Sequence, residues 1–189
     1  MWYSDKKMIG EEMLKETIRS CAFTGHRPKS FSFGYSEDSK EFQMLYTKMK
    51  NTVIQVCNAG CRRFYCGMAE GVDLWCGEIV LSLQNEFDPP LEIFAVVPYL
   101  AQPASMTEIN QRRYHRIMAR SKERFLISRE FTKACFSKRN RFLVDSADAL
   151  IAVYNESEYR SGTGQTVRYA KSRKKRIFQI SVTESMKKT

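Results

Sequence analysis

Short apolar runs alternate along the chain with segments in which apolar residues recur at helical spacing. Apolar runs of this length, bounded by Gly, Pro or polar residues, are typical of strands buried in a sheet. The predicted strands are 21–23, 63–66, 91–97, 124–128, 149–154 and 177–180. Between the first two strands, Phe42, Leu45, Met49 and Val53 keep the spacing of one helix face, and Gly60 stops that helix. The predicted helices are 42–56, 72–84, 106–120, 135–146 and 165–173.

This alternation predicts an α/β fold in which helices cover both faces of a mainly parallel sheet, giving three layers. The 189 residues suffice for a single domain with a sizeable core. We place that domain at 19–182, after an N-terminal extension at 1–18 and before a polar tail at 183–189. In such sheets, ligands bind beyond the carboxyl ends of the strands, where the winding direction switches. We therefore expect the residues that directly follow the strands to form a site.

The chain is basic, with a formal net charge of +10 at pH 7. Lys and Arg crowd the segment from Arg168 to Arg176. A basic balance suits nucleic acid, an acidic membrane or a phosphorylated small ligand. We interpret the C-terminal charges as a solvated helix face and tail, with nucleic-acid contact as the alternative. The apolar runs are too short to span a membrane and the N-terminus lacks a signal-peptide core, so we expect a cytoplasmic protein without membrane contact.

The six cysteines raise the question of disulfides or a metal site. Cys57, Cys61 and Cys66 miss the paired CxxC spacing of structural zinc, and the two histidines, His26 and His115, lie far from them in the sequence. Several cysteines lie inside apolar runs, where a thiol behaves as a small hydrophobic group. We expect buried, reduced thiols, no metal and no cofactor.

Four candidate ligand residues follow the first predicted strand, namely Thr24, Gly25, His26 and Arg27. Glycine permits a tight turn with exposed N–H groups, and the fork of donors on Arg27 suits a phosphate. His26 could contact a base or a ribose, or only cap the loop. The alternative for the whole segment is an ordinary turn with one surface arginine.

The sequence GMAEGVD at 67–73 follows the second predicted strand. Gly67 and Gly71 flank the start of a helix, where backbone N–H groups can face an anion. The segment is not the GxGxxG dinucleotide fingerprint, and it lacks the Lys-Ser/Thr of a P-loop. Asp73 either complements the helix dipole or accepts a hydrogen bond from a ribose hydroxyl.

Further polar residues lie near the ends of the later strands. Tyr99 and Gln102 follow the third long strand; Tyr99 can stack on a base and Gln102 can donate or accept a hydrogen bond, although both could serve packing. Arg139 and Asn140 form an Arg-Asn pair on the helix at 135–146. We count all four as candidate ligand-binding residues.

The stretch SGTGQT at 161–166 connects an apolar strand to a predicted helix. Glycines let the backbone approach an anion, and the free N–H groups of the first helical turn point at it. The candidate phosphate ligands here are Ser161, Gly162, Thr163, Gly164, Gln165 and Thr166. A plain connection is the alternative reading of this loop, but the convergence of several such loops at one sheet edge predicts a pocket.

In this order, the motifs resemble those of the YpsA-like proteins, also called the DUF1273 or UPF0398 family, of the SLOG superfamily. The resemblance rests on TGHRP at 24–28, on Gly67 to Asp73, on Pro98 with Gln102, on the Arg-Asn pair, and on the 161–170 segment. It covers about residues 19–182 and implies a single Rossmann-like domain that binds a nucleotide-derived ligand. The superfamily also contains the LOG-type phosphoribohydrolases and the DNA-processing protein DprA.

The chain departs from the LOG pattern at one decisive position. LOG-type enzymes use an Arg together with a Glu that follows the glycine loop, and Val167-Arg168 stands at that place here. An arginine cannot act as a base at neutral pH. Arg139 and Glu70, the latter on the second loop, remain as candidate catalytic residues, so enzymatic activity is an open question.

The sequence therefore favours a sensor or regulatory protein that binds a phosphorylated nucleotide or a nucleotide-derived small ligand. One alternative is a LOG-like nucleotide N-glycosidase, and a second is a DprA-like DNA-binding protein. A homodimer is implied by the resemblance to LOG-type relatives. The identity of the ligand and the pathway are left open by the sequence.

Overall fold

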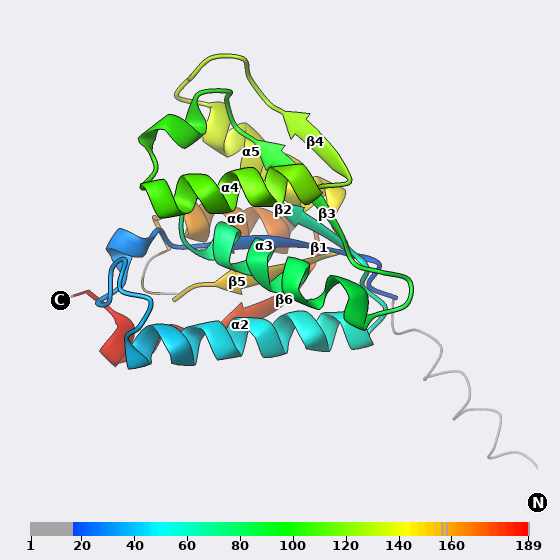
Figure 1. Cartoon of the computed structure of the whole chain (residues 1–189), viewed down its shortest axis with the longest axis horizontal. Coiled ribbons are helices and arrows are strands. Elements are labelled where there is room, and N and C mark those ends of the chain that lie inside the picture. The colour runs from blue at the N-terminus through cyan, green and yellow to red at the C-terminus, as the bar shows by residue number, and fades with distance from the viewer. Residues whose placement is uncertain (1–16, 156, 158, 189) are drawn as a thin grey trace, which may run out of the picture.

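The fold is built on a parallel sheet. In the computed structural model, which describes residues 17–155, 157 and 159–188, six strands form one sheet in the order β4-β3-β2-β1-β5-β6. Every neighbouring pair of these strands is parallel (Figure 1). The strands are β1 (Ser20–Gly25), β2 (Arg63–Cys66), β3 (Glu92–Val97), β4 (Glu123–Leu126), β5 (Ala149–Val153) and β6 (Arg176–Ile180). The predicted mainly parallel sheet is confirmed.

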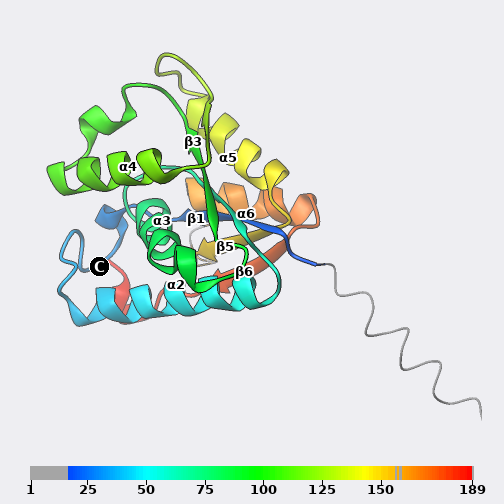
Figure 2. The ribbon, with the colours of Figure 1, turned by 45° about the vertical axis from the view of Figure 1, so that its right-hand side comes forward.

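Helices cover both faces of this sheet. The α-helices are α2 (Lys40–Asn58), α3 (Val72–Leu83), α4 (Glu108–Arg120), α5 (Cys135–Ser146) and α6 (Gly162–Ser172). Helices α2, α3 and α4 pack together on one face, while α5 and α6 pack together on the other (Figure 2). Apolar residues that meet across these layers form one core on each face. The predicted three-layer, Rossmann-like architecture is confirmed.

Strand β1 lies in the middle of the sheet, between β2 and β5. It pairs with β5 from Cys21 opposite Ala149 to Gly25 opposite Val153, so the two strands end side by side. From β1 the chain winds outward to β4, and it then returns through α5 to β5 on the other side of β1. The winding direction therefore switches between β1 and β5, which is where ligands bind in sheets of this kind.

The six cysteines are buried and carry free thiols, as expected from the sequence. Burial raises the pKa of the Cys57 thiol to about 11 and that of Cys61 to about 12. Because the thiolate is the reactive form, these two groups are inert packing elements at neutral pH.

Helix α6 begins earlier than predicted. The sequence indicated a helix from residue 165, whereas α6 starts at Gly162 with Ser161 as its N-cap. The Ser161 hydroxyl accepts a hydrogen bond from the Gly164 N–H at 3.0 Å. Serine favours this capping position, but the two glycines lower the helix propensity of the first turn and conceal its start. The predicted loop at 161–166 is therefore mostly the first turns of a helix.

Residues just outside the predicted domain limits of 19–182 also pack into the core. Ile18 is buried ahead of β1, and residues 1–16 of the predicted N-terminal extension lie outside the described residues. Within the predicted polar tail, Glu184–Met186 form a 3₁₀ turn and Met186 is fully buried. The Met186 carbonyl accepts a hydrogen bond from the Ser32 N–H at 2.9 Å. One buried methionine has no periodicity, so the pattern along the chain could not reveal this contact.

Over the part of the chain that the structure describes, no helix combines the length and the hydropathy needed to cross a membrane.

Candidate ligand-binding site

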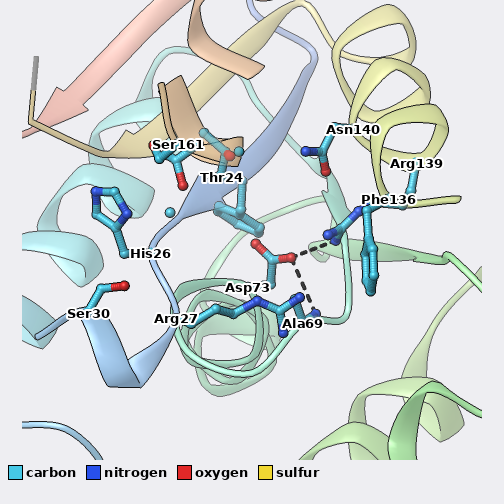
Figure 3. Close-up of a pocket in the computed structure, with 14 residues that line it drawn as sticks. Thr24, His26, Arg27, Ser30, Ala69, Asp73, Phe136, Arg139, Asn140 and Ser161 are labelled. Carbon is cyan, nitrogen blue, oxygen red and sulfur yellow. Dashed lines mark hydrogen bonds and ion pairs between the residues drawn. The ribbon is translucent and has the colours of Figure 1, made fainter. Parts of the chain in front are cut away.

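A pocket of about 300 Å³ opens at the switch between β1 and β5. Its walls come from the loop after β1, the loop between β2 and α3, the first turns of α5 and the start of α6 (Figure 3). The lining residues are Phe23, Thr24, Gly25, His26, Arg27, Ser30, Ala69, Asp73, Phe136, Arg139, Asn140, Ser161, Gly162 and Thr163. Ten of the candidate residues named from the sequence therefore meet around one space.

The start of α6 presents backbone donors to this pocket. The Ser161 hydroxyl accepts a hydrogen bond from the Gly164 N–H, and the Ser161 carbonyl accepts one from the Gln165 N–H at 2.9 Å. The N–H groups of Gly162 and Thr163 have no intrahelical acceptor and bond to none of the described residues. Both residues line the pocket, so the partial positive charge of the helix terminus faces it.

Glycine at position 162 is required neither by the backbone nor by packing. Its φ is not positive, and a Cβ built there meets nothing within 4 Å. A side chain at this point would occupy open space beside the helix terminus. The bare backbone therefore leaves room for a ligand to approach the N–H groups closely.

A buried ion pair forms the floor of the pocket. Arg139 and Asp73 lie 2.8 Å apart between Nη1 and Oδ2, with the Arg139 residue only 5% exposed. Arg139 also donates to the Gly67 carbonyl, and Asp73 accepts the Ala69 N–H at 3.3 Å. A Cβ at Gly67 would lie 1.8 Å from Arg139 Nη1, so only glycine leaves room for the guanidinium. Asp73 Oδ2, a candidate ribose acceptor, is thus already engaged by Arg139 and Ala69.

Arg139 retains one buried donor beyond this pair. Its Nε is buried and makes no hydrogen bond with the residues the structure describes. Buried donors are normally satisfied, and Arg139 lines the pocket. Leaving this donor without a partner among the described residues costs stability, and the cost falls on a residue of the pocket lining.

Arg27 supplies the second positive charge. Its guanidinium lies 5.9 Å from the centre of the Phe136 ring and forms no ion pair with any described residue. Loss of hydration inside the hollow lowers the pKa of Arg27, an effect that Asp73 opposes and Arg139 reinforces. The group remains charged at neutral pH. With two guanidinium groups and one carboxylate among the lining residues, the pocket suits an anion.

Two glycines bring the loops of the site into contact. A Cβ at Gly25 would lie 2.5 Å from the Val72 side chain, so the end of β1 can press against the start of α3. Gly71 adopts a φ of +89°, and a Cβ there would lie 2.8 Å from the His26 carbonyl oxygen. Such backbone is open to glycine and strained for other residues. Gly71 thus supports the first loop from behind and does not line the pocket.

Several other candidates lie outside the pocket lining. Gln102 is buried and donates to the Met68 carbonyl at 3.0 Å, holding a residue whose φ is +59°. Tyr99 packs edge-to-face against Phe131 and Phe136. These two residues support the walls of the site, and do not form them.

The later residues of the 161–166 stretch point elsewhere. Gln165 and Thr166 line a smaller neighbouring pocket of about 120 Å³, which shares Asn140 with the main one. The Thr166 hydroxyl donates to the Gly162 carbonyl at 2.9 Å. Gly164 is buried inside the first turn and gives its N–H to Ser161. The three residues at 161–163 are therefore the part of this stretch that lines the main pocket.

Glu70, the candidate acid of the second loop, is used in the structure to join loops. Its Oε1 accepts hydrogen bonds from the Thr107 N–H at 2.9 Å and from Asn110 Nδ2 at 3.0 Å. Its Oε2 accepts from the Tyr35 hydroxyl at 3.3 Å. Arg168, at the place of the LOG acid, is exposed and donates to the Tyr159 carbonyl. Among the described lining residues, Asp73 is thus the one carboxylate at the pocket.

Within the described residues, no group of three or more His, Cys, Asp or Glu side chains is placed to hold a metal ion.

Four lining residues were missed by sequence reasoning, namely Phe23, Ser30, Ala69 and Phe136. Phe136 had a usable signal, because it precedes Arg139 and Asn140 by three and four positions in a predicted helix, which places it on the same face. Ser30 had none, because it reaches the pocket through the 3₁₀ turn Pro28–Ser30.

The chain has relatives among known proteins. The sequence profile of the YpsA family, described as the "YspA SLOG family", matches residues 21–185. The chain belongs to this family. A UPF0398 protein of Bacillus licheniformis is 30% identical over 166 residues, covering 86% of this chain and 89% of the relative. The UPF0398 protein YpsA of Bacillus subtilis is 27% identical over 156 residues, covering 78% and 85%.

Among solved structures, this YpsA-family chain is similar to DNA processing protein A from Helicobacter pylori. The TM-score is 0.61 at 18% identity, with 90% of this chain and 69% of that chain covered. The description of that structure concerns single-stranded DNA binding. At this level of identity the likeness establishes a shared fold, and it agrees with membership of the SLOG superfamily.

Proposed function

We propose that this YpsA-family protein binds a phosphorylated nucleotide or a nucleotide-derived small molecule, in the role of a sensor or regulator. The observation that supports the proposal most directly is the meeting of two kinds of anion donor in one pocket. The N–H groups of Gly162 and Thr163 and the Arg27 guanidinium, which pair with none of the described residues, line the same space. A phosphate would accept from both at once.

The other walls suit the sugar of a nucleotide. Asn140 and Thr24 also line the pocket. Amide and hydroxyl groups can both donate to and accept from ribose hydroxyls. Each hydrogen bond to a charged group contributes about 1.5–3 kcal/mol, so three or four support micromolar affinity after the costs of association.

The pocket favours binding over bond cleavage. An N-glycosidase of the LOG type needs a carboxylate at the reacting centre, and Asp73 is held by Arg139 at 2.8 Å. Glu70 is bonded to Thr107 and Asn110 away from the pocket lining. The glycosidase hypothesis predicts that free base appears when nucleoside monophosphates are incubated with concentrated protein, and we expect none.

Titration calorimetry tests the proposal with the whole chain. The panel comprises AMP, ADP, ATP, ADP-ribose, ribose 5-phosphate and inorganic phosphate. We expect at least one nucleotide or nucleotide derivative to bind, and Arg27→Gln to weaken it about 10- to 100-fold, because one charge-assisted contact is lost. Arg112→Gln is the matched control, since Arg112 is an exposed arginine paired with Glu108 on α4. If the full panel fails to bind at millimolar concentration, the proposal is wrong.

Single-stranded DNA is the second candidate ligand, supported by the fold shared with a DNA-binding protein and by the net charge of +10. A polymer that contacts many phosphates releases many counterions, so its affinity falls steeply with salt. A mononucleotide shows a shallow dependence. Binding of an oligonucleotide at physiological salt, with a steep salt slope and no binding of mononucleotides, would favour DNA over the small ligand.

A further inference from the structure

Three aromatic rings form a cluster at the rim of the pocket. Tyr99 follows β3, Phe131 lies in the loop after β4, and Phe136 lies in the first turn of α5. Ring centres are 5.4 Å apart for Tyr99 and Phe131, 6.0 Å for Tyr99 and Phe136, and 6.3 Å for Phe131 and Phe136. All three pairs meet edge-to-face. Phe136 also lines the pocket, so the cluster is continuous with it.

The outer part of this cluster is exposed to solvent. Phe131 is 61% exposed and Leu100, next to Tyr99, is 61% exposed. Loop geometry holds these residues in place, because the Leu100 N–H donates to the Arg129 carbonyl at 3.4 Å and the Cys135 N–H to the Thr132 carbonyl at 3.1 Å. Phe131 is thus largely exposed on a loop whose neighbouring backbone is held by hydrogen bonds.

One cation contacts the rings, and three more lie within two positions of Phe131 or Phe136 in the sequence, as does the acidic Glu130. The Arg27 guanidinium lies 5.9 Å from the Phe136 ring centre, and both residues line the pocket. Arg129, Lys133 and Lys138 are exposed on the segment that carries Phe131 and on the helix that follows it. Aromatic faces interleaved with cations are suited to a flat, electron-rich group attached to a phosphate, which is the chemistry of a nucleotide.

We propose that the Tyr99–Phe131–Phe136 cluster is the base-binding platform of the pocket, with the nucleobase stacked against the exposed face of Phe131. This inference rests on the proposed function, since the phosphate and ribose would occupy the pocket itself. The occupant is the base of that same ligand because the rings continue the pocket wall through Phe136. Stacking accepts any base, so the platform contributes affinity with little sequence selectivity.

Two ligands and two substitutions test the platform. AMP carries a base and ribose 5-phosphate does not, and calorimetry measures both against the wild type, Phe131→Ala and Phe131→Trp. We expect Phe131→Ala to weaken AMP about 5- to 100-fold and to leave ribose 5-phosphate unchanged. Phe131→Trp should retain or strengthen AMP binding, because a larger ring stacks at least as well. Met44→Ala, which removes another exposed apolar side chain on α2, is the control and should change neither ligand.

Each other outcome overturns the inference. An equal loss for both ligands would assign Phe131 a role in holding the pocket together, and an unchanged AMP affinity would place the base elsewhere. Sedimentation of wild type and Phe131→Ala shows whether the exposed rings hold two copies of the chain together; a dimer lost on substitution would make the cluster an interface between copies. If neither AMP nor ribose 5-phosphate binds the wild type, the nucleotide that does bind from the calorimetry panel replaces AMP in this test; if the whole panel fails to bind, the nucleotide pocket and the platform both fail. If AMP binds the wild type and Phe131→Ala equally well, the platform is wrong and the nucleotide pocket is still supported.

Discussion

The polar groups at the two ends of the parallel sheet differ in how they are hydrogen-bonded. At the amino ends of β1 and β5, polar groups satisfy one another. Asp148 Oδ2 accepts from the N–H groups of Arg19 at 2.9 Å and Ser20 at 3.0 Å, and from the Ser20 hydroxyl at 2.9 Å. Beside them, Arg62 Nη1 donates to the Cys57 carbonyl at 2.7 Å and to the Cys61 carbonyl at 2.9 Å.

At the carboxyl ends, several donors of residues that line the pocket instead lack a partner among the described residues. The N–H groups of Gly162 and Thr163, the Arg27 guanidinium and the buried Nε of Arg139 bond to none of the described residues. Unsatisfied donors cost stability. At the amino ends, the buried Nε of Arg62 also lacks a partner among the described residues, so the two ends differ in that only at the carboxyl ends do such donors belong to residues gathered around the pocket. The amino end holds strands together, whereas the carboxyl end surrounds the pocket for which we propose an anionic ligand.

The largest effect should come from breaking the one strong pair at the carboxyl end. Asp73→Asn leaves the Arg139 charge buried without its counter-charge, and we expect the free energy of unfolding to fall by about 3–5 kcal/mol. Chemical denaturation measures this loss. Combining Asp73→Asn with Arg139→Met removes the stranded charge and should recover much of the stability. A single variant as stable as the wild type would mean that the pair is not held in the buried state described here.

Two glycine substitutions distinguish a glycine that leaves room for a ligand from a glycine that is required by its backbone conformation. A Cβ meets nothing within 4 Å at either Gly162 or Gly34, but Gly34 has a φ of +55°. Gly162→Ala should keep or slightly raise the unfolding temperature, because alanine favours a helix, and should weaken the phosphorylated ligand about 5- to 100-fold by filling its space. Gly34→Ala should lower the free energy of unfolding by about 1 kcal/mol, because alanine is strained at this φ, and should leave the ligand affinity unchanged. Equal affinities for wild type and Gly162→Ala would remove the ligand from the start of α6.

The smallest effect is expected at the amino end. Partial burial by itself would raise the pKa of Asp148, but the hydrogen bonds from Arg19 and Ser20 hold that pKa below its ordinary value. A carboxylate with a lowered folded-state pKa stabilises the fold above its unfolded-state pKa, and the contribution disappears as pH falls through the folded-state pKa. Asp148→Asn should therefore lower the free energy of unfolding by about 1 kcal/mol at pH 7. The difference from wild type should shrink below about pH 4, as thermal melts across pH would show, and ligand affinity should stay unchanged; a pH-independent difference would contradict this.

The periodicity of the chain was enough to locate every strand and α-helix among the described residues to within a few positions. Helix α2, for example, was visible in the spacing of Phe42, Leu45, Met49 and Val53, all of which are buried. The predicted start of α6 was wrong because the glycines in its first turn have a low helix propensity. The burial of Met186 could not be predicted for another reason, because its partners lie more than 150 positions away along the chain.

The sequence predicted which residues gather at the candidate site, but it did not predict which of them line the pocket and which support its walls. Because strands of a parallel sheet end at one edge, Thr24, Arg27, Asn140 and Gly162 could be expected together, and they line one pocket. Nothing along the chain distinguishes Gly71, which supports a loop, from Gly162, which faces open space. Side-chain direction makes that distinction, and it depends on which elements pack against each other.

By itself, the sequence determined the α/β architecture, the edge of the sheet that carries the site, and the family, because these follow from periodicity and from local motifs. The tertiary structure alone decided that Asp73 belongs to Arg139, that Glu70 joins loops outside the pocket, and that Phe131 extends an aromatic rim from it. The reason is physical. Local pattern specifies which face of an element is buried, whereas partners that lie 40 or 66 positions apart meet only when the layers pack.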